Sequence, residues 1–206
     1  KELKTVATDS HRMSQKVITL EKNGDNFDVV IPSRSLREFT SVFSDDIETV
    51  EVFFANNQIL FRSEHISFYT RLLEGNYPDT DRLIPTEFNT EATFNVANLR
   101  FAMERARLLS NATQNGTVKL EFKNGVVSSH VHSPEVGRVN EEIDTSAVSG
   151  EDLSISFNPT YLIEALKAID SEQVVIRFIS SVRPFTLVPE GNEQGFIQLI
   201  TPVRTN

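Results

Sequence analysis

Hydrophobic and polar positions repeat three times along the chain in the same order. Each copy begins with alternating apolar residues, passes through a break containing Pro, Asn or Ser, and then changes to helical spacing. The copies occupy residues 27–43, 92–109 and 153–169. A period of two predicts a strand, and a period of 3.6 predicts an amphipathic helix. The repeat therefore predicts one supersecondary unit used several times, which constrains the fold.

Each predicted helix is followed by two strand-like runs around a turn and then by a third run. The second copy has the clearest turn, because Asn124-Gly125 separates its two runs and this dipeptide is a strong hairpin signal. The paired runs are 50–55 with 58–62, 117–122 with 126–132, and 173–179 with 183–188, and the third runs are 66–73, 138–144 and 196–201. The unit is therefore strand, helix and three strands.

The predicted fold class is α+β, with helices on one face of antiparallel sheets. One unit cannot close a core alone, because the apolar face of a sheet must be covered. Residues 5–9 and 14–21 resemble the last strands of a further unit without its helix, so we expect Lys1 to lie inside a module of a longer protein. Pairing the copies predicts a partial domain at 1–83 and a whole domain at 84–206, separated near a polar, turn-rich segment.

Composition narrows the class of protein. The chain has 206 residues, no Cys and a formal net charge of −9. Without Cys there is no disulfide framework and no thiolate metal site. No apolar run is long enough to cross a bilayer and the start does not resemble a signal peptide, so we expect a cytoplasmic chain without a membrane partner. The negative charge excludes a surface that is basic all over, but it permits a local basic stripe.

Arginines outside the apolar stripes of the predicted helices have two interpretations. They are Arg34 and Arg37 in the first copy and Arg100 and Arg107 in the second. Charged helix faces are usually only solvated. The alternative is that these side chains share one surface and contact phosphates.

A second set of candidate residues lies near a predicted hairpin. His130 and His132 are two apart, so on a strand they face the same side and could chelate a metal, with Glu135 nearby. A metal-dependent enzyme is therefore one alternative, and a solvated hairpin end is the other. A third ligand is not visible, and the sequence contains no phosphate-binding loop or nucleophile-elbow motif. We expect no metal and no cofactor.

Five strings then combine into a resemblance that covers essentially the whole chain. They are ATDSHRM at 7–13, LLEGNYPDTDRLIP at 72–85, ARLLSN at 106–111, FNPTYL at 157–162 and ITPVR at 200–204. Their order and spacing resemble the bacterial DNA sliding clamps, the beta subunits of the replicative DNA polymerase III holoenzyme. The resemblance implies the DNA-clamp fold, with this chain matching part of the middle domain and the whole last domain.

The resemblance implies a function without catalysis. Clamps of this family form a head-to-tail homodimeric ring around duplex DNA, with helices lining the hole, and act as processivity factors in the nucleoid. Sliding needs contacts that ignore base sequence, which Lys and Arg make with phosphates. This favours a DNA-facing role for the four arginines named above. A clamp-like module that only binds proteins is the remaining alternative.

The resemblance also implies a pocket for a short motif that contains Gln and hydrophobic residues. Such motifs come from the replicative polymerase, the clamp loader and repair proteins. The matching positions are Thr8, Ser10, His11, Arg12, Met13, Pro78, Arg82, Leu83, Asn158, Tyr161, Val182, Pro184, Leu199, Thr201, Pro202, Val203 and Arg204. Met13, Leu83, Val182, Leu199 and Val203 are expected to form an apolar cleft. Ser10 stands where relatives commonly have Gly, and Thr201 where some have Met.

Each of these positions also has a simpler interpretation. Without the resemblance, His11 is an ordinary loop histidine, Tyr161 a core residue and 200–204 an edge strand. Leu108 and Leu109 match residues that meet the neighbouring subunit in clamps, but both could instead belong to the intramolecular core. Because the first domain lies outside this sequence, we expect the fragment to be a monomer or a weak oligomer.

Overall fold

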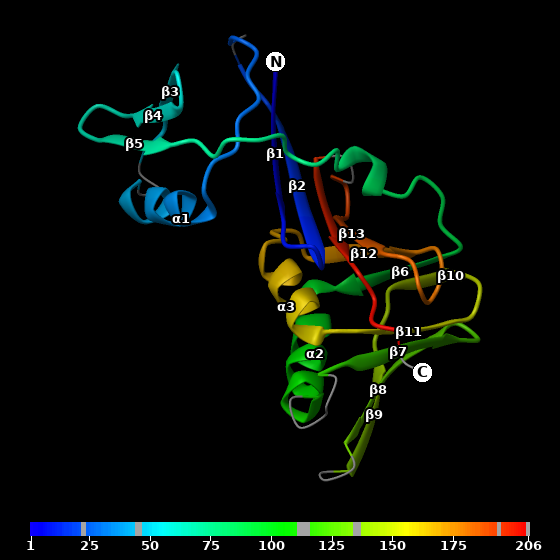
Figure 1. Cartoon of the computed structure of the whole chain (residues 1–206). Helices are drawn as coiled ribbons and strands as arrows, with labels where there is room; N and C mark the ends of the chain where they lie inside the picture. The colour runs from blue at the N-terminus through cyan, green and yellow to red at the C-terminus, as the bar shows by residue number, and fades with distance from the viewer. Residues whose placement is uncertain (22–23, 44–46, 111–115, 134–136, 193–194, 205–206) are drawn as a thin grey trace. The chain divides into compact units, whose positions relative to one another are not determined.

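The computed structural model describes residues 1–21, 24–43, 47–110, 116–133, 137–192 and 195–204. The chain forms two compact units. The larger unit contains residues 1–22 and 80–206, and the smaller unit contains residues 23–79. The described residues form antiparallel sheets and helices (Figure 1), in agreement with the predicted α+β class.

The larger unit is built on two antiparallel sheets. The first has seven strands in the order β1 (Glu2–Thr8), β2 (Arg12–Thr19), β14 (Phe196–Ile200), β13 (Phe185–Pro189), β12 (Gln173–Phe178), β6 (Thr90–Asn95) and β10 (Ala147–Gly150). The second has four strands in the order β11 (Leu153–Phe157), β7 (Val118–Lys123), β8 (Val126–Ser133) and β9 (Gly137–Ile143). The two sequence copies exchange strands, since β6 pairs with β12 and β11 pairs with β7.

Two helices cover the inner faces of these sheets. They are α2 (Val96–Ser110) and α3 (Pro159–Lys167), which lie side by side in Figure 1. The stripe predicted on α2 is confirmed, because Leu99, Ala102, Met103 and Ala106 are buried. Their side chains join the core with aromatic residues such as Phe94. Strand exchange therefore lets the two copies share a single core.

The hairpin at the start of the chain extends the seven-stranded sheet. Strand β2 pairs with β14 in a register that places Met13 opposite Leu199 and Arg12 opposite Ile200. A short 3-10 helix, η1 (Asp81–Leu83), adds an ion pair between Lys4 and Asp81. Residues close to the start of the chain therefore lie beside its last strand.

The smaller unit contains one copy of the repeat. Helix α1 (Ser33–Val42) accompanies the three-stranded sheet β3 (Glu51–Ala55), β4 (Gln58–Arg62) and β5 (Ser67–Arg71). No residue of α1 is buried among those described. In this helix Phe39 stacks on Phe43 and packs against Phe61 and Phe68, and the Ser35 hydroxyl lies 2.8 Å from that of Thr70. This is a small aromatic cluster with little enclosed core.

One predicted strand is wrong, and one observed strand was not predicted. The strand expected at 27–31 is reduced to one bridge between Val30 and Leu73. Its equivalent in the larger unit, β11, pairs with β7 of the other copy, and the described residues of the smaller unit offer no such partner. Strand β10 was not predicted, because the sequence AVSG has too little alternation to indicate one.

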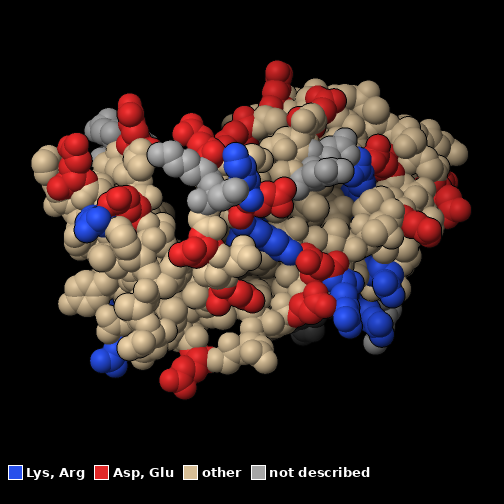
Figure 2. All heavy atoms as spheres, turned by 90° about the horizontal axis from the view of Figure 1, so that it is seen from above, with Lys and Arg blue, Asp and Glu red and all other residues tan. Residues whose placement is uncertain are grey.

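The described helices include none that is long and apolar enough to cross a membrane. Over the face drawn in Figure 2, acidic side chains lie among basic ones. This distribution agrees with the negative net charge of the sequence.

Candidate functional site

The turn between β1 and β2 is held by its own side chains. The Asp9 carboxylate accepts hydrogen bonds from the backbone N–H groups of His11 and Arg12, both at 3.2 Å. The Thr8 hydroxyl donates to the carbonyl of Arg12 at 2.8 Å. Ser10 has a φ of +72°, in the left-handed region that Gly adopts without steric cost. This conformation explains why Gly suits the position and Ser is strained there.

The turn is attached directly to the end of β14. The backbone N–H of Thr201 donates to the carbonyl of His11 at 2.9 Å. Met13 and Leu199 face each other across the strand pair and are almost fully buried. Five predicted site residues, Thr8, His11, Met13, Leu199 and Thr201, are therefore brought together by the sheet.

Helix α3 supplies the neighbouring wall. Its N-cap is Asn158, whose side chain accepts a hydrogen bond from the Thr160 N–H at 2.9 Å, and Pro159 is its first residue. The ring of Tyr161 stacks on that of His11, with centroids 5.9 Å apart and planes 15° from parallel. After β14 the chain runs beside β11, where Val203 N–H donates to the Ser156 carbonyl at 2.7 Å.

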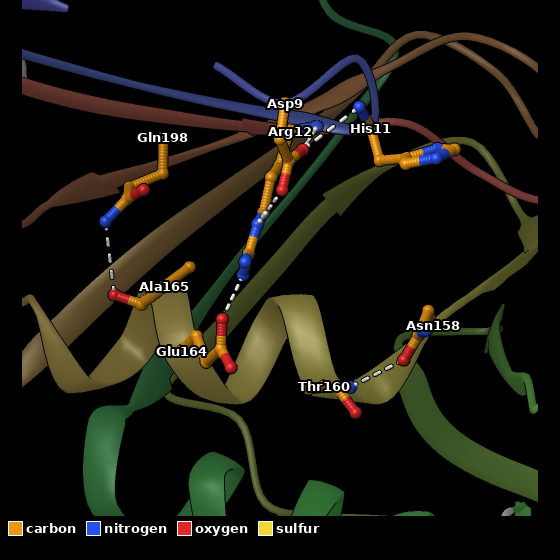
Figure 3. Close-up of polar contacts among 8 residues, drawn as sticks. All are labelled: Asp9, His11, Arg12, Asn158, Thr160, Glu164, Ala165 and Gln198. Carbon is orange, nitrogen blue, oxygen red and sulfur yellow. Dashed lines mark hydrogen bonds and ion pairs between the residues drawn. The ribbon is translucent and has the colours of Figure 1, made fainter. Parts of the chain in front are cut away.

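Arg12 connects the turn to the helix (Figure 3). Its Nε donates to Asp9 Oδ2 at 2.9 Å, and its Nη1 pairs with Glu164. Its guanidinium carbon lies 4.7 Å from the centroid of the Tyr161 ring. The side chain is thus fixed by two carboxylates and by a cation–π contact.

These contacts shift two pKa values. Partial burial alone would lower the pKa of Arg12, but hydrogen bonds to Glu164 and Asp9 outweigh it and raise that pKa. Partial burial alone would raise the pKa of Asp9, but the hydrogen bonds from Arg12 and from the backbone of His11 outweigh it and lower that pKa. Both shifts favour the charged forms of Asp9 and Arg12.

Sequence reasoning did not identify three residues of this arrangement. They are Asp9, Glu164 and Gln198, whose side chain donates to the Ala165 carbonyl of α3 at 3.3 Å. Two had a usable signal. Asp9 precedes a turn, and its carboxylate could accept hydrogen bonds from the backbone N–H groups of that turn. Glu164 lies three residues after Tyr161 and therefore on the same face of the helix.

The other predicted pocket residues are more dispersed. Leu83 and Val182 are exposed, whereas Met13 and Leu199 are buried. Arg82 lies in η1, and Pro184 precedes β13. Pro202 and Arg204 follow β14, and Pro78 belongs to the smaller unit.

A cavity of about 330 Å³ opens in the smaller unit and not at this site. It is lined by Phe53, Phe54, Ala55, Gln58, Ile59, Leu60 and Tyr69.

The four arginines proposed to face DNA have different surroundings. In α1, Arg37 is exposed and Arg34 Nε lies 3.0 Å from Glu38. In α2, Arg100 Nε lies 3.8 Å from Glu104, and Arg107 is partly buried.

The two leucines near the end of α2 also differ. Leu108 is 73% exposed, whereas Leu109 packs against the core of the larger unit. The intramolecular interpretation therefore fits Leu109 and does not fit Leu108.

The histidine pair has ordinary polar partners. His130 Nε2 lies 2.9 Å from the Ser128 hydroxyl and 3.2 Å from Glu121, and its Nδ1 lies 2.8 Å from Asn140 Oδ1. His132 is exposed, and Glu135 lies outside the described residues. Within the described ranges, no group of three His, Cys, Asp or Glu side chains could hold a metal ion. The arrangement around His130 gives no support to a metal-dependent enzyme.

Two family models match the chain. Residues 1–79 match the central domain of the DNA polymerase III beta subunit, and residues 81–204 match its C-terminal domain.

Individual relatives agree with these models. A beta sliding clamp of Streptococcus pneumoniae is 81% identical over all 206 residues, and one of Lactococcus lactis is 56% identical. A crystal structure of the S. pneumoniae DNA polymerase III beta chain covers 100% of this chain at 80% identity with a TM-score of 0.96. A sliding clamp of Bacillus subtilis gives 38% identity and a TM-score of 0.94. The chain spans about half, 54%, of the length of these relatives.

Proposed function

The chain belongs to the DNA polymerase III beta subunit family, the beta sliding clamps, and from this membership we propose that it is part of a DNA sliding clamp. The whole protein would be a processivity factor without catalytic chemistry of its own. It would encircle duplex DNA as a homodimeric ring and hold the replicative polymerase, the clamp loader and repair proteins on it. Its place of action would be the cytoplasm, at the nucleoid.

The part of this function that we assign to the larger unit is capture of partner peptides. The supporting observation is the junction of the turn at 8–13, the end of β14 and the start of α3. There Thr201 N–H bonds to His11 O, Met13 faces Leu199, and His11 stacks on Tyr161. A short segment with one polar and several aliphatic anchors suits a site with few polar groups at an apolar base.

We also propose that Arg34, Arg37, Arg100 and Arg107 contribute to the surface that faces DNA. Their positions on α1 and α2, outside the apolar stripes, support this role. Contacts of guanidinium groups with phosphates would be independent of base sequence and weakened by salt.

The subunit contact is proposed to include Leu108, with Leu109 supporting it from the core side. Leu108 is 73% exposed in the single chain, and a neighbouring subunit would cover this large apolar side chain. We propose the domain division at 83/84. The fragment by itself would be a monomer or a weak oligomer.

The peptide-binding proposal is tested by titrating a labelled peptide with Gln and aliphatic residues into the chain and following fluorescence anisotropy. We expect a Kd in the micromolar range, about −8 kcal/mol, as for short linear motifs. Met13→Ala should weaken binding by roughly tenfold, since anchor contacts carry most of the binding energy. Removal of 202–206 should also weaken it, and none of the described residues among them, 202–204, is buried.

Ile143→Ala is the matched control for Met13→Ala, because it truncates a buried apolar side chain on β9, outside the proposed site. The assignment of the site would be contradicted if Met13→Ala and the chain without 202–206 both bound the peptide as tightly as the parent, with thermal unfolding curves like that of the parent.

A further inference from the structure

The ion-paired group at the junction of the turn and α3 has an unequal charge balance. Two carboxylates, Asp9 and Glu164, flank the single guanidinium of Arg12, so the three groups together carry one negative charge. They lie on different elements, because Asp9 and Arg12 belong to the turn and the start of β2, while Glu164 lies on α3. The long-range pair between Arg12 and Glu164 therefore depends on the folded arrangement.

Arg12 retains hydrogen-bonding capacity in this arrangement. A guanidinium has five N–H donors, and the contacts described above use Nε and Nη1. No described residue accepts a hydrogen bond from Nη2, and a third of the Arg12 side chain, 33%, is exposed. The guanidinium carbon also lies over the ring of Tyr161, which restricts the positions that the group can take. An oriented pair of donors is thus accessible beside the predicted anchor residues.

The chemistry of the acceptor follows from the charges. A carboxylate approaching Nη2 would meet a guanidinium whose charge is already balanced by two carboxylates, and it would be repelled by both of them. A neutral amide carbonyl needs only the donors and suffers no net repulsion. We propose that Glu164 is a specificity-determining residue, which makes the edge of Arg12 select a neutral amide carbonyl of the partner segment over a carboxylate. This inference rests on the peptide-binding function proposed above and specifies its chemistry.

The test uses pairs of peptides that are nearly identical in shape. At each position of the Gln-containing aliphatic peptide, a Gln form and a Glu form are compared by anisotropy titration against the parent chain and against Glu164→Gln. At the position that reaches Arg12, the parent should bind the Gln form about fivefold more tightly than the Glu form, the range expected for partly exposed charges. In Glu164→Gln that ratio should fall to about twofold or below. The difference should shrink in 0.5 M salt, because exposed charges are screened.

Two further variants separate the local effect from overall charge. Glu142→Gln removes the same charge from an exposed position on β9, and it should leave every ratio as in the parent. In the double variant Arg12→Gln with Glu164→Gln, the Gln-to-Glu affinity ratio should be the same at every peptide position, since the preference for Gln acts through the guanidinium.

The outcomes distinguish this inference from the proposed function. If the peptides bind the parent but the Gln-to-Glu ratios are the same in Glu164→Gln, the role of Glu164 is wrong while the peptide site stands. The same conclusion follows if Glu142→Gln changes the ratios equally. If no peptide binds the parent chain, both proposals are wrong.

Discussion

Each copy of the repeat has a leucine at the equivalent position of its helix, but this leucine is buried in the larger unit and exposed in the smaller one. Leu99 on α2 and Leu162 on α3 are fully buried, whereas Leu36 on α1 is 41% exposed. The larger unit contains two copies that exchange strands around one core, and the smaller unit contains one copy. The apolar stripe therefore specifies a helix, while burial of that stripe depends on a second copy that completes the layer.

The largest expected difference comes from truncating these leucines. Leu99→Ala or Leu162→Ala should lower the free energy of unfolding of the larger unit by about 2–5 kcal/mol, because each leaves a cavity in a closed core. Leu36→Ala should cost less than about 1 kcal/mol in the smaller unit, since much of the side chain is already in water. Hydrogen exchange measured by mass spectrometry separates the two units. Equal losses would contradict the contrast between closed and open cores.

Two glycines with positive φ give a smaller contrast. A Cβ on Gly150, at φ +99°, would lie 1.9 Å from the Asn89 carbonyl oxygen, whereas a Cβ on Gly75, at φ +112°, meets nothing within 4 Å. Gly150→Ala should therefore destabilise the larger unit by about 2–4 kcal/mol, through steric overlap and backbone strain together. Gly75→Ala should cost about 1 kcal/mol in the smaller unit from strain alone. Urea denaturation followed by hydrogen exchange gives the loss of unfolding free energy in each variant. A larger loss in Gly75→Ala than in Gly150→Ala would contradict this prediction.

The smallest contrast concerns charge. The pKa of Asp9 is lowered in the folded chain, so its ionised form stabilises the larger unit above pH 3.8, and this contribution is lost as the pH falls through the lowered folded value. Asp9→Asn should lower stability by less than about 1 kcal/mol at pH 7, because the carboxylate is partly exposed. The difference between parent and variant should vanish at lower pH, as urea midpoints at pH 7, 5 and 3 would show.

The exposed pair of Arg34 and Glu38 in α1 is the control for that experiment. Glu38→Gln should change the midpoint by almost nothing at any of these pH values. A pH-independent loss in Asp9→Asn would mean that its hydrogen-bonding geometry matters and its charge does not.

Local features of the fold were predictable from the sequence. Helical spacing around Leu36, Leu99 and Leu162 indicated the three helices, and Asn124-Gly125 marked the turn of the β7–β8 hairpin, where both residues have positive φ. Pairing between distant strands was not predictable in the same way. Which strand β2 joins depends on an exposed edge of β14, about 180 residues away, and no local pattern encodes that partner.

The candidate site likewise has residues that the sequence identified and one that only the tertiary structure reveals. The turn at 8–13 and the last strand were identified through the resemblance to clamps, and the structure places Met13 beside Leu199. Glu164 was missed because on sequence alone it was one charged residue on a solvated helix face. Its role depends on a contact with Arg12, 152 residues away, which only the tertiary structure provides.

The most direct test of the peptide site is a ¹H–¹⁵N NMR titration of the chain with the Gln-containing aliphatic peptide. The two units again provide the comparison, because the larger holds the junction at Met13 and Leu199 and the smaller holds the apolar cavity lined by Phe53 and Tyr69. We expect the largest chemical-shift changes in residues 8–13, 158–164 and 199–203. Shift changes confined to residues 53–60 and 69, with the junction unaffected, would contradict it.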